Sequence, residues 1–234
     1  LGYFMIETIQ LLPGITLQCC PDDRFKQSCI SLSIVRPMCR QEAAMNALLP
    51  AVLLRGTQKH PDLRAITWHL DDLYGASAGT QVRRVGDYQT TGFYFGFIED
   101  RYALSGDRIL AAVVDFLREL LLEPVLEDGA FARDFVEGEK RNLIAAIEAQ
   151  RNDKRVYASA RMMELMCRED SFGIPRLGTK EDVAAITAQA LYDHFRRILQ
   201  QSRIDLFYVG SADPEQVAAH LRPLFSQIAR SYLP

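Results

Sequence analysis

The stretch that decides the fold is residues 76–98, ASAGTQVRRVGDYQTTGFYFGFI. Gly86 and Asp87 in its middle form a two-residue hairpin signal, and strand-forming residues lie on both sides of it. The pattern predicts two antiparallel strands, Ala76–Val85 and Tyr88–Ile98. Successive side chains of a strand point to opposite faces, so three aromatic side chains share one apolar face: Phe93, Phe95 and Phe97. We expect that face to pack against a core rather than to stack on nucleic-acid bases.

More strands are predicted before this hairpin, and mostly helices after it. Short apolar runs bounded by proline and glycine predict strands, and apolar residues three and four apart predict helices. The predicted strands are 5–11, 15–20, 29–35 and 204–209, and the predicted helical stretches are 41–55, 62–74, 107–122, 131–166, 180–200 and 214–229. This order indicates an α+β fold with a largely antiparallel sheet and helices packed on one face. No linker interrupts residues 1–234, so we expect a single domain.

The composition is that of a globular protein, with 48% hydrophobic residues, 24% charged residues and a net charge of −3. This balance gives no basic patch for nucleic acid, and no apolar run is long enough to cross a membrane.

The cysteines are odd in number and irregularly spaced: Cys19, Cys20, Cys29, Cys39 and Cys167. A disulfide framework is therefore not expected, and the pattern favours a cytoplasmic protein. All five are expected to be small buried residues.

The helix predicted over Gln41–Arg55 is rich in alanine and leucine and almost without charge. Such a helix must be buried nearly all round. Pro50 lies inside it and cannot donate a backbone hydrogen bond, which costs about 3 kcal/mol in an ordinary helix interior. We therefore expect a kink at Pro50 and a helix end at Gly56.

Four short strings along the chain resemble signatures of one peptidase family. They are LLRGTQKHP (53–61), LDDLYGA (70–76), GTKEDVAAIT (178–187) and DLFYVG (205–210). Their order is similar to that in one half of the pitrilysin/insulinase-type zinc peptidases, the inverzincins. Lys26, Ala47–Pro50, Arg55–Thr57 and Leu73–Ala76 resemble a non-catalytic bacterial branch of that family, some of whose members are named for an association with elongation-factor-P modification. Family members contain two similar halves, and this chain resembles the N-terminal half, with a connector starting near residues 231–234.

The resemblance also implies that the zinc site is lost. Active members carry His-x-x-Glu-His on the first buried helix, where the two histidines bind zinc and the glutamate acts as general base. The matching positions are Ala47, Pro50 and Ala51. A third ligand, a glutamate on a later helix, falls at Ala145 or Ala146. None of these residues can bind a metal ion, so we expect no catalytic residue, no metal and no cofactor.

A displaced metal site is the alternative. None of the four histidines, His60, His69, His194 and His220, pairs with another at a spacing of four. His69 shares a helix face with Asp72, but a solvated surface is the expected setting for both. We expect His194 and His220 to be ordinary residues of amphipathic helices.

The sequence therefore predicts a catalytically inactive peptidase homologue. Its expected partners are a homologous peptidase subunit, a second copy of the chain, or an extended peptide added as a strand to the hairpin Ala76–Ile98. Nucleic acid and membranes are not expected partners. An active zinc endopeptidase with a displaced site and a scaffold for a protein-modification pathway remain as alternatives.

Overall fold

The computed structural model describes residues 6–232, apart from the side chain of Ser105. Met5, where the first strand was expected to begin, and residues 233–234 of the expected connector lie outside that range. Within it, the strands form a six-stranded sheet in the order β1-β2-β8-β3-β5-β4 and a separate ribbon, β6-β7. Their bounds are β1 (Glu7–Leu12), β2 (Ile15–Pro21), β3 (Gln27–Pro37), β4 (Ser77–Val85), β5 (Tyr88–Ile98), β6 (Leu126–Glu127), β7 (Ala130–Phe131) and β8 (Arg203–Gly210).

The sheet is largely antiparallel, as predicted, with β2 and β8 as its parallel pair. Phe93 of β5 lies opposite Leu32 of β3, which lies opposite Leu206 of β8. All three side chains are buried. At the hairpin, Gly86 adopts a φ of 58°, a left-handed conformation that glycine reaches without strain.

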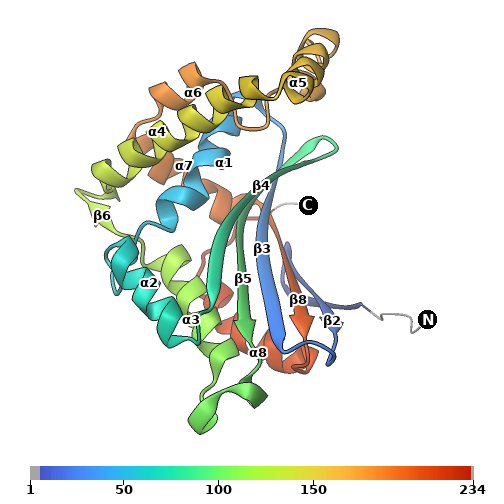
Figure 1. Ribbon diagram of the computed structural model, residues 1–234, viewed down its shortest axis with the longest axis vertical. Coiled ribbons are helices and arrows are strands. Elements are labelled where there is room, and N and C mark those ends of the chain that lie inside the picture. The colour runs from blue at the N-terminus through green and yellow to red at the C-terminus, as the bar shows by residue number, and fades with distance from the viewer. Residues whose placement is uncertain (1–5, 233–234) are drawn as a thin grey trace.

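The helices lie on one side of this sheet (Figure 1). Contacts with the strands come from α1, α3 and α8. The helices are α1 (Arg40–Leu53), α2 (Leu63–Asp72), α3 (Ile109–Leu122), α4 (Arg133–Ala149), α5 (Lys154–Met166), α6 (Lys180–Ala185), α7 (Ala188–Gln201) and α8 (Pro214–Ser226). In the part of the chain described, none of them is long and apolar enough to cross a membrane.

Burial along β5 confirms the predicted apolar face. Phe93, Phe95 and Phe97 are at most 2% exposed, whereas Tyr94 between them is 44% exposed. Phe95 also meets Phe116 of α3 edge to face, with ring centroids 6.0 Å apart. The aromatic strand therefore joins the sheet to the helical layer.

The helical stretch predicted over residues 131–166 is interrupted. It divides into α4, a short 3-10 turn η3 (Gln150–Asn152), and α5. Asp153 has an extended backbone, and its side chain accepts hydrogen bonds from the backbone N–H groups of Arg155 and Val156. This N-cap starts a new helix, and α5 can therefore leave the line of α4 (Figure 1).

The expectation that all five cysteines are buried was wrong. They are free thiols, and Cys19 is buried while Cys29 is exposed. Cys29 points to the face of the sheet without helices, whereas its neighbour Ile30 is fully buried on the other face. Burial is the largest cause that raises the pKa of the Cys19 thiol to about 12.

Candidate functional site

The positions predicted for the zinc motif lie on α1 and α4. On α1, Ala47 is 6% exposed, Pro50 is buried and Ala51 is half-buried. On α4, Ala145 and Ala146 are exposed. The two helices pack against each other. The side chains at these five positions offer no donor atom to a metal ion, so they do not fit zinc.

One ion pair ties the end of the first helix to α4. Arg55, just beyond α1, lies 3.2 Å from Glu139 of α4, and the Glu139 side chain is 12% exposed. Arg55 also lies over the ring of Phe135, 5.6 Å from its centroid. The Glu139 side chain is therefore largely covered by this contact.

The proline in α1 is accommodated by a residue of the sheet. The helix continues from Arg40 to Leu53 with Pro50 inside it. Because Pro50 has no N–H, the carbonyl of Asn46, four residues earlier, loses its usual helical donor. The Thr91 hydroxyl on β5 donates to that carbonyl over 2.6 Å. A buried acceptor that the proline would leave unsatisfied is therefore paired.

Asn46 also anchors a buried polar network that joins α1 to β5 and α7. It is 0% exposed, and its side-chain Nδ2 donates to Gln89 Oε1 over 2.9 Å. Gln89 in turn donates to the backbone carbonyls of Ala43 and Arg176, at 3.0 and 2.7 Å. His194 Nε2 lies 2.7 Å from Asn46 Oδ1. The network fixes α1 against the sheet and against the segment that precedes α6.

His194 is neutral in this setting. Its Nε2 must donate to the amide oxygen of Asn46, and its Nδ1 accepts from Arg197 over 2.8 Å. Burial is the largest cause that lowers the pKa of His194 to about 4. His194 was expected to be an ordinary residue of an amphipathic helix, and it lies on the buried face of α7, where it is 3% exposed. Nearby, burial opposes the charge of Glu42, but Arg36 and Arg197 bind its carboxylate and hold its pKa below the ordinary value.

A second buried carboxylate holds the loop that follows α1. Glu119 of α3 is 0% exposed. It accepts from the Thr57 hydroxyl at 3.1 Å and from Lys59 at 3.2 Å, and its Oε2 lies 2.8 Å from His60 Nδ1. The His69 ring stacks on His60 with centroids 4.3 Å apart, and burial is the largest cause that lowers the pKa of His69. His69 was expected on a solvated surface, but it is half-buried. Sequence reasoning missed this cluster.

Neither histidine belongs to a metal cluster. Across residues 6–232, no group of three or more histidine, cysteine, aspartate or glutamate side chains is placed to hold a metal ion.

Strand β4 is an edge of the six-stranded sheet and lies beside α1. Val85 and Tyr88 flank the two-residue turn and therefore form a hydrogen-bonded pair. It follows that the backbone groups of alternate residues, among them Thr80 and Val82, point away from β5. The guanidinium of Arg176 donates to the outward carbonyl of Val82. Strand addition was expected on the whole hairpin, but only β4 offers a free edge, because β5 is paired on both sides.

Comparison with known proteins relates this chain to peptidase-like proteins. No family model matches the chain. A protein of Bacillus subtilis (strain 168) named "Probable inactive metalloprotease YmfF" is 31% identical over 218 residues, which cover 93% of this chain and 51% of that protein. The chain therefore spans about half the length of this relative.

Two solved structures share the fold. A conserved protein from Enterococcus faecalis V583 matches with a TM-score of 0.89 and 25% identity, over 94% of this chain and 52% of the other. A peptidase M16 inactive domain from Pseudomonas fluorescens matches with a TM-score of 0.73 and 14% identity, over 98% of this chain and 52% of the other. Together these matches show that the chain has the fold of a peptidase M16 inactive domain, and they relate its sequence to a protein named as an inactive metalloprotease.

Proposed function

We propose that this chain is a catalytically inactive peptidase homologue that binds an extended peptide along the free edge of β4. Three positions of the zinc motif hold Ala47, Pro50 and Ala51, and the curated relative is itself named inactive. The observation that carries the proposal is the unpaired edge of β4 beside α1. An extended peptide can add to such an edge through main-chain hydrogen bonds.

A proline in the edge strand tests this proposal. Thr80 points its backbone N–H outward, so Thr80→Pro removes one donor from the free edge and leaves the pairing with β5 intact. Thr80→Ala keeps the donor and serves as the matched control. We expect Thr80→Pro to weaken binding of a fluorescein-labelled (Gln-Val)4 peptide, measured by anisotropy, by about fivefold, the value of one hydrogen bond. Equal affinity of both variants would exclude strand addition at β4.

The same proposal includes a homologous partner. The chain covers about half of the relatives it matches, and we propose that it acts as an N-terminal half domain beside a second half or a homologous subunit in the cytoplasm. Affinity capture of the tagged protein from its native cell, read by mass spectrometry, tests this. Recovery of a homologue with an intact His-x-x-Glu-His helix supports a paired enzyme in which this chain is silent. Recovery of translation or modification factors without any homologue contradicts it.

A further inference from the structure

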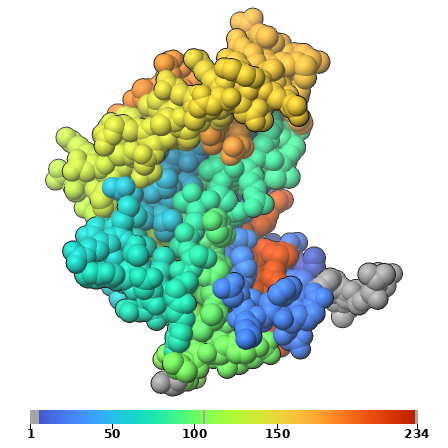
Figure 2. Space-filling view, viewed as in Figure 1, coloured from blue at the N-terminus to red at the C-terminus, as the bar shows by residue number. Residues whose placement is uncertain are grey.

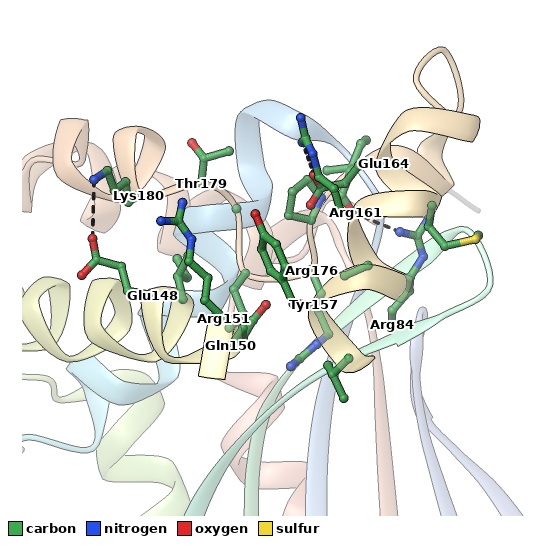
Figure 3. A pocket seen from close by; sticks show the side chains of 18 of the residues that line it. Arg84, Glu148, Gln150, Arg151, Tyr157, Arg161, Glu164, Arg176, Thr179 and Lys180 are labelled. Atoms are coloured by element: carbon green, nitrogen blue, oxygen red, sulfur yellow. Dashed lines mark hydrogen bonds and ion pairs between the residues drawn. The ribbon is translucent and has the colours of Figure 1, made fainter. Parts of the chain in front are cut away.

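A cavity of about 680 Å³ lies between the end of α4, helix α5 and the segment that leads into α6 (Figure 3). Ile147 and Glu148 line it directly after the motif positions Ala145 and Ala146. The tip of the β4–β5 hairpin forms another wall, through Arg84. In the space-filling view, α5 lies above this hairpin at the top of the molecule (Figure 2).

Three guanidinium groups line the cavity without a carboxylate partner among the described residues. Arg84 donates to the backbone carbonyls of Phe172 and Ile174, at 3.3 and 3.1 Å. Arg176 donates to a backbone carbonyl of β4. Arg151 lies near the ring of Tyr157, 6.0 Å from its centroid. These contacts hold the side chains in place and leave their charges uncompensated.

The acidic residues of the lining do not neutralise them. Glu148 is paired with Lys180 at 3.5 Å, and Glu164 is paired with Arg161 at 2.6 Å. With Glu181 counted as well, the lining keeps an excess of two positive charges. This excess contrasts with the net charge of −3 of the whole chain, so the positive cavity is a local feature.

One donor in the cavity wall also lacks an acceptor. Arg84 Nη2 is buried and makes no hydrogen bond among the described residues. The Arg84 guanidinium instead lies over the ring of Phe172, 4.5 Å from its centroid, and a carboxylate is the ligand group that best fits a guanidinium that lines a cavity. The remaining wall is apolar in part, with Val156 54% exposed and Met163 36% exposed. The site therefore suits a ligand that alternates acidic and apolar groups.

One residue, Arg176, joins the cavity to the edge of β4. Arg176 both lines the cavity and donates to the carbonyl of Val82 on that edge. A peptide added to β4 directs alternate side chains toward the helical side of the sheet, where Arg84 also points. The side chains that pass this end of β4 therefore face the three guanidinium groups.

We propose that this cavity selects acidic side chains of the extended peptide bound along β4. The inference rests on the proposed function, because β4 must hold the peptide backbone.

Three fluorescein-labelled peptides test it: (Glu-Val)4, (Gln-Val)4 and (Lys-Val)4, titrated with the protein by anisotropy. We expect (Glu-Val)4 to bind at least about fivefold more tightly than (Gln-Val)4 at low salt, and (Lys-Val)4 to bind most weakly. The advantage should shrink in about 0.5 M salt, which screens exposed charges. Arg151→Gln should reduce the advantage of (Glu-Val)4, because Arg151 makes no structural hydrogen bond among the described residues. Arg141→Gln, on the exposed side of α4 and outside the cavity, is the matched control.

The outcomes separate the two proposals. Equal affinity for (Glu-Val)4 and (Gln-Val)4 overturns the acidic preference and leaves strand addition standing. Equal losses in Arg151→Gln and Arg141→Gln assign the preference to general surface charge and overturn the role of the cavity. Failure of all three peptides to bind overturns both proposals.

Discussion

The Thr91 hydroxyl of β5 donates to the backbone carbonyl of Asn46 in α1 over 2.6 Å, at the point where Pro50 removes the helical donor. Thr91 is 1% exposed, so water cannot replace it. We expect Thr91→Val to lower the free energy of unfolding by about 1–3 kcal/mol, because a buried carbonyl is left unsatisfied. Thr91→Ser keeps the hydroxyl and should cost less. Urea unfolding monitored by circular dichroism measures both.

A double-mutant cycle checks the cause. Pro50→Ala restores an N–H four residues after Asn46, so it should recover part of the stability that Thr91→Val loses. If the two substitutions are strictly additive, the Thr91 hydroxyl does not act by replacing the helical donor.

His194 should make stability depend on pH. Its pKa is lowered to about 4 in the folded protein, against about 6.5 in an unfolded chain. Between these pH values the unfolded state binds more protons than the folded state, so stability falls as the pH is lowered. The contribution of neutral His194 is complete above a pH of about 6.5 and is lost as the pH falls toward 4. The unfolding free energy changes by at most about 1.4 kcal/mol per pH unit over this window. In His194→Gln, which cannot be protonated, the unfolding free energy should fall less steeply over this window. Parallel curves for both proteins would refute the assignment.

Glu119 should be among the most sensitive positions outside the apolar core. Glu119→Ala leaves the donors on Thr57, Lys59 and His60 without their acceptor, and we expect a loss of about 3–5 kcal/mol in unfolding free energy. Glu119→Gln keeps the shape and should cost less. Glu123→Ala, directly after the end of the same helix, removes a pair in which the Glu123 side chain is 37% exposed, and it should cost less than about 1 kcal/mol. Similar losses in Glu119→Ala and Glu123→Ala would contradict the buried role of Glu119.

The assignment of the lost motif can be tested by rebuilding it. A triple variant with Ala47→His, Pro50→Glu and Ala51→His restores the helical motif. Two complete variants add a third ligand to it, one through Ala145→Glu and the other through Ala146→Glu. We expect one of the two complete variants to compete with a chromophoric chelator for zinc, whereas the unmodified chain does not. Circular dichroism verifies that each variant is folded. If both are folded and neither binds zinc, the motif positions are misassigned.

The strands of the six-stranded sheet and the order of the helices could be predicted from the sequence. The predicted strand Tyr88–Ile98 has the bounds of β5, because a hairpin signal and an alternating aromatic pattern fixed both its start and its face. The interruption at Asp153 was missed, because good helix formers lie on both sides of the cap. His194 could have been predicted as buried, since it lies three residues after Leu191 and four before Ile198, both on the buried face of α7.

The pairing of Glu119 with His60 could not have been predicted in this way. The two residues are 59 positions apart, and no local pattern relates them. Only the packing of α3 against the loop after α1 brings the carboxylate to the imidazole. The same holds for Thr91 and Asn46, whose partnership depends on the register between a strand and a helix.

The replacement at Pro50 has a consequence for the history of this chain. A single reversion to glutamate would place a carboxylate at a buried position, beside alanines at positions 47 and 51 that supply no cation. A buried carboxylate without a cation beside it is costly, so Pro50→Glu alone should destabilise the fold before any metal could bind. The glutamate and the two histidines would therefore have to be restored together, because only bound zinc compensates the added charge.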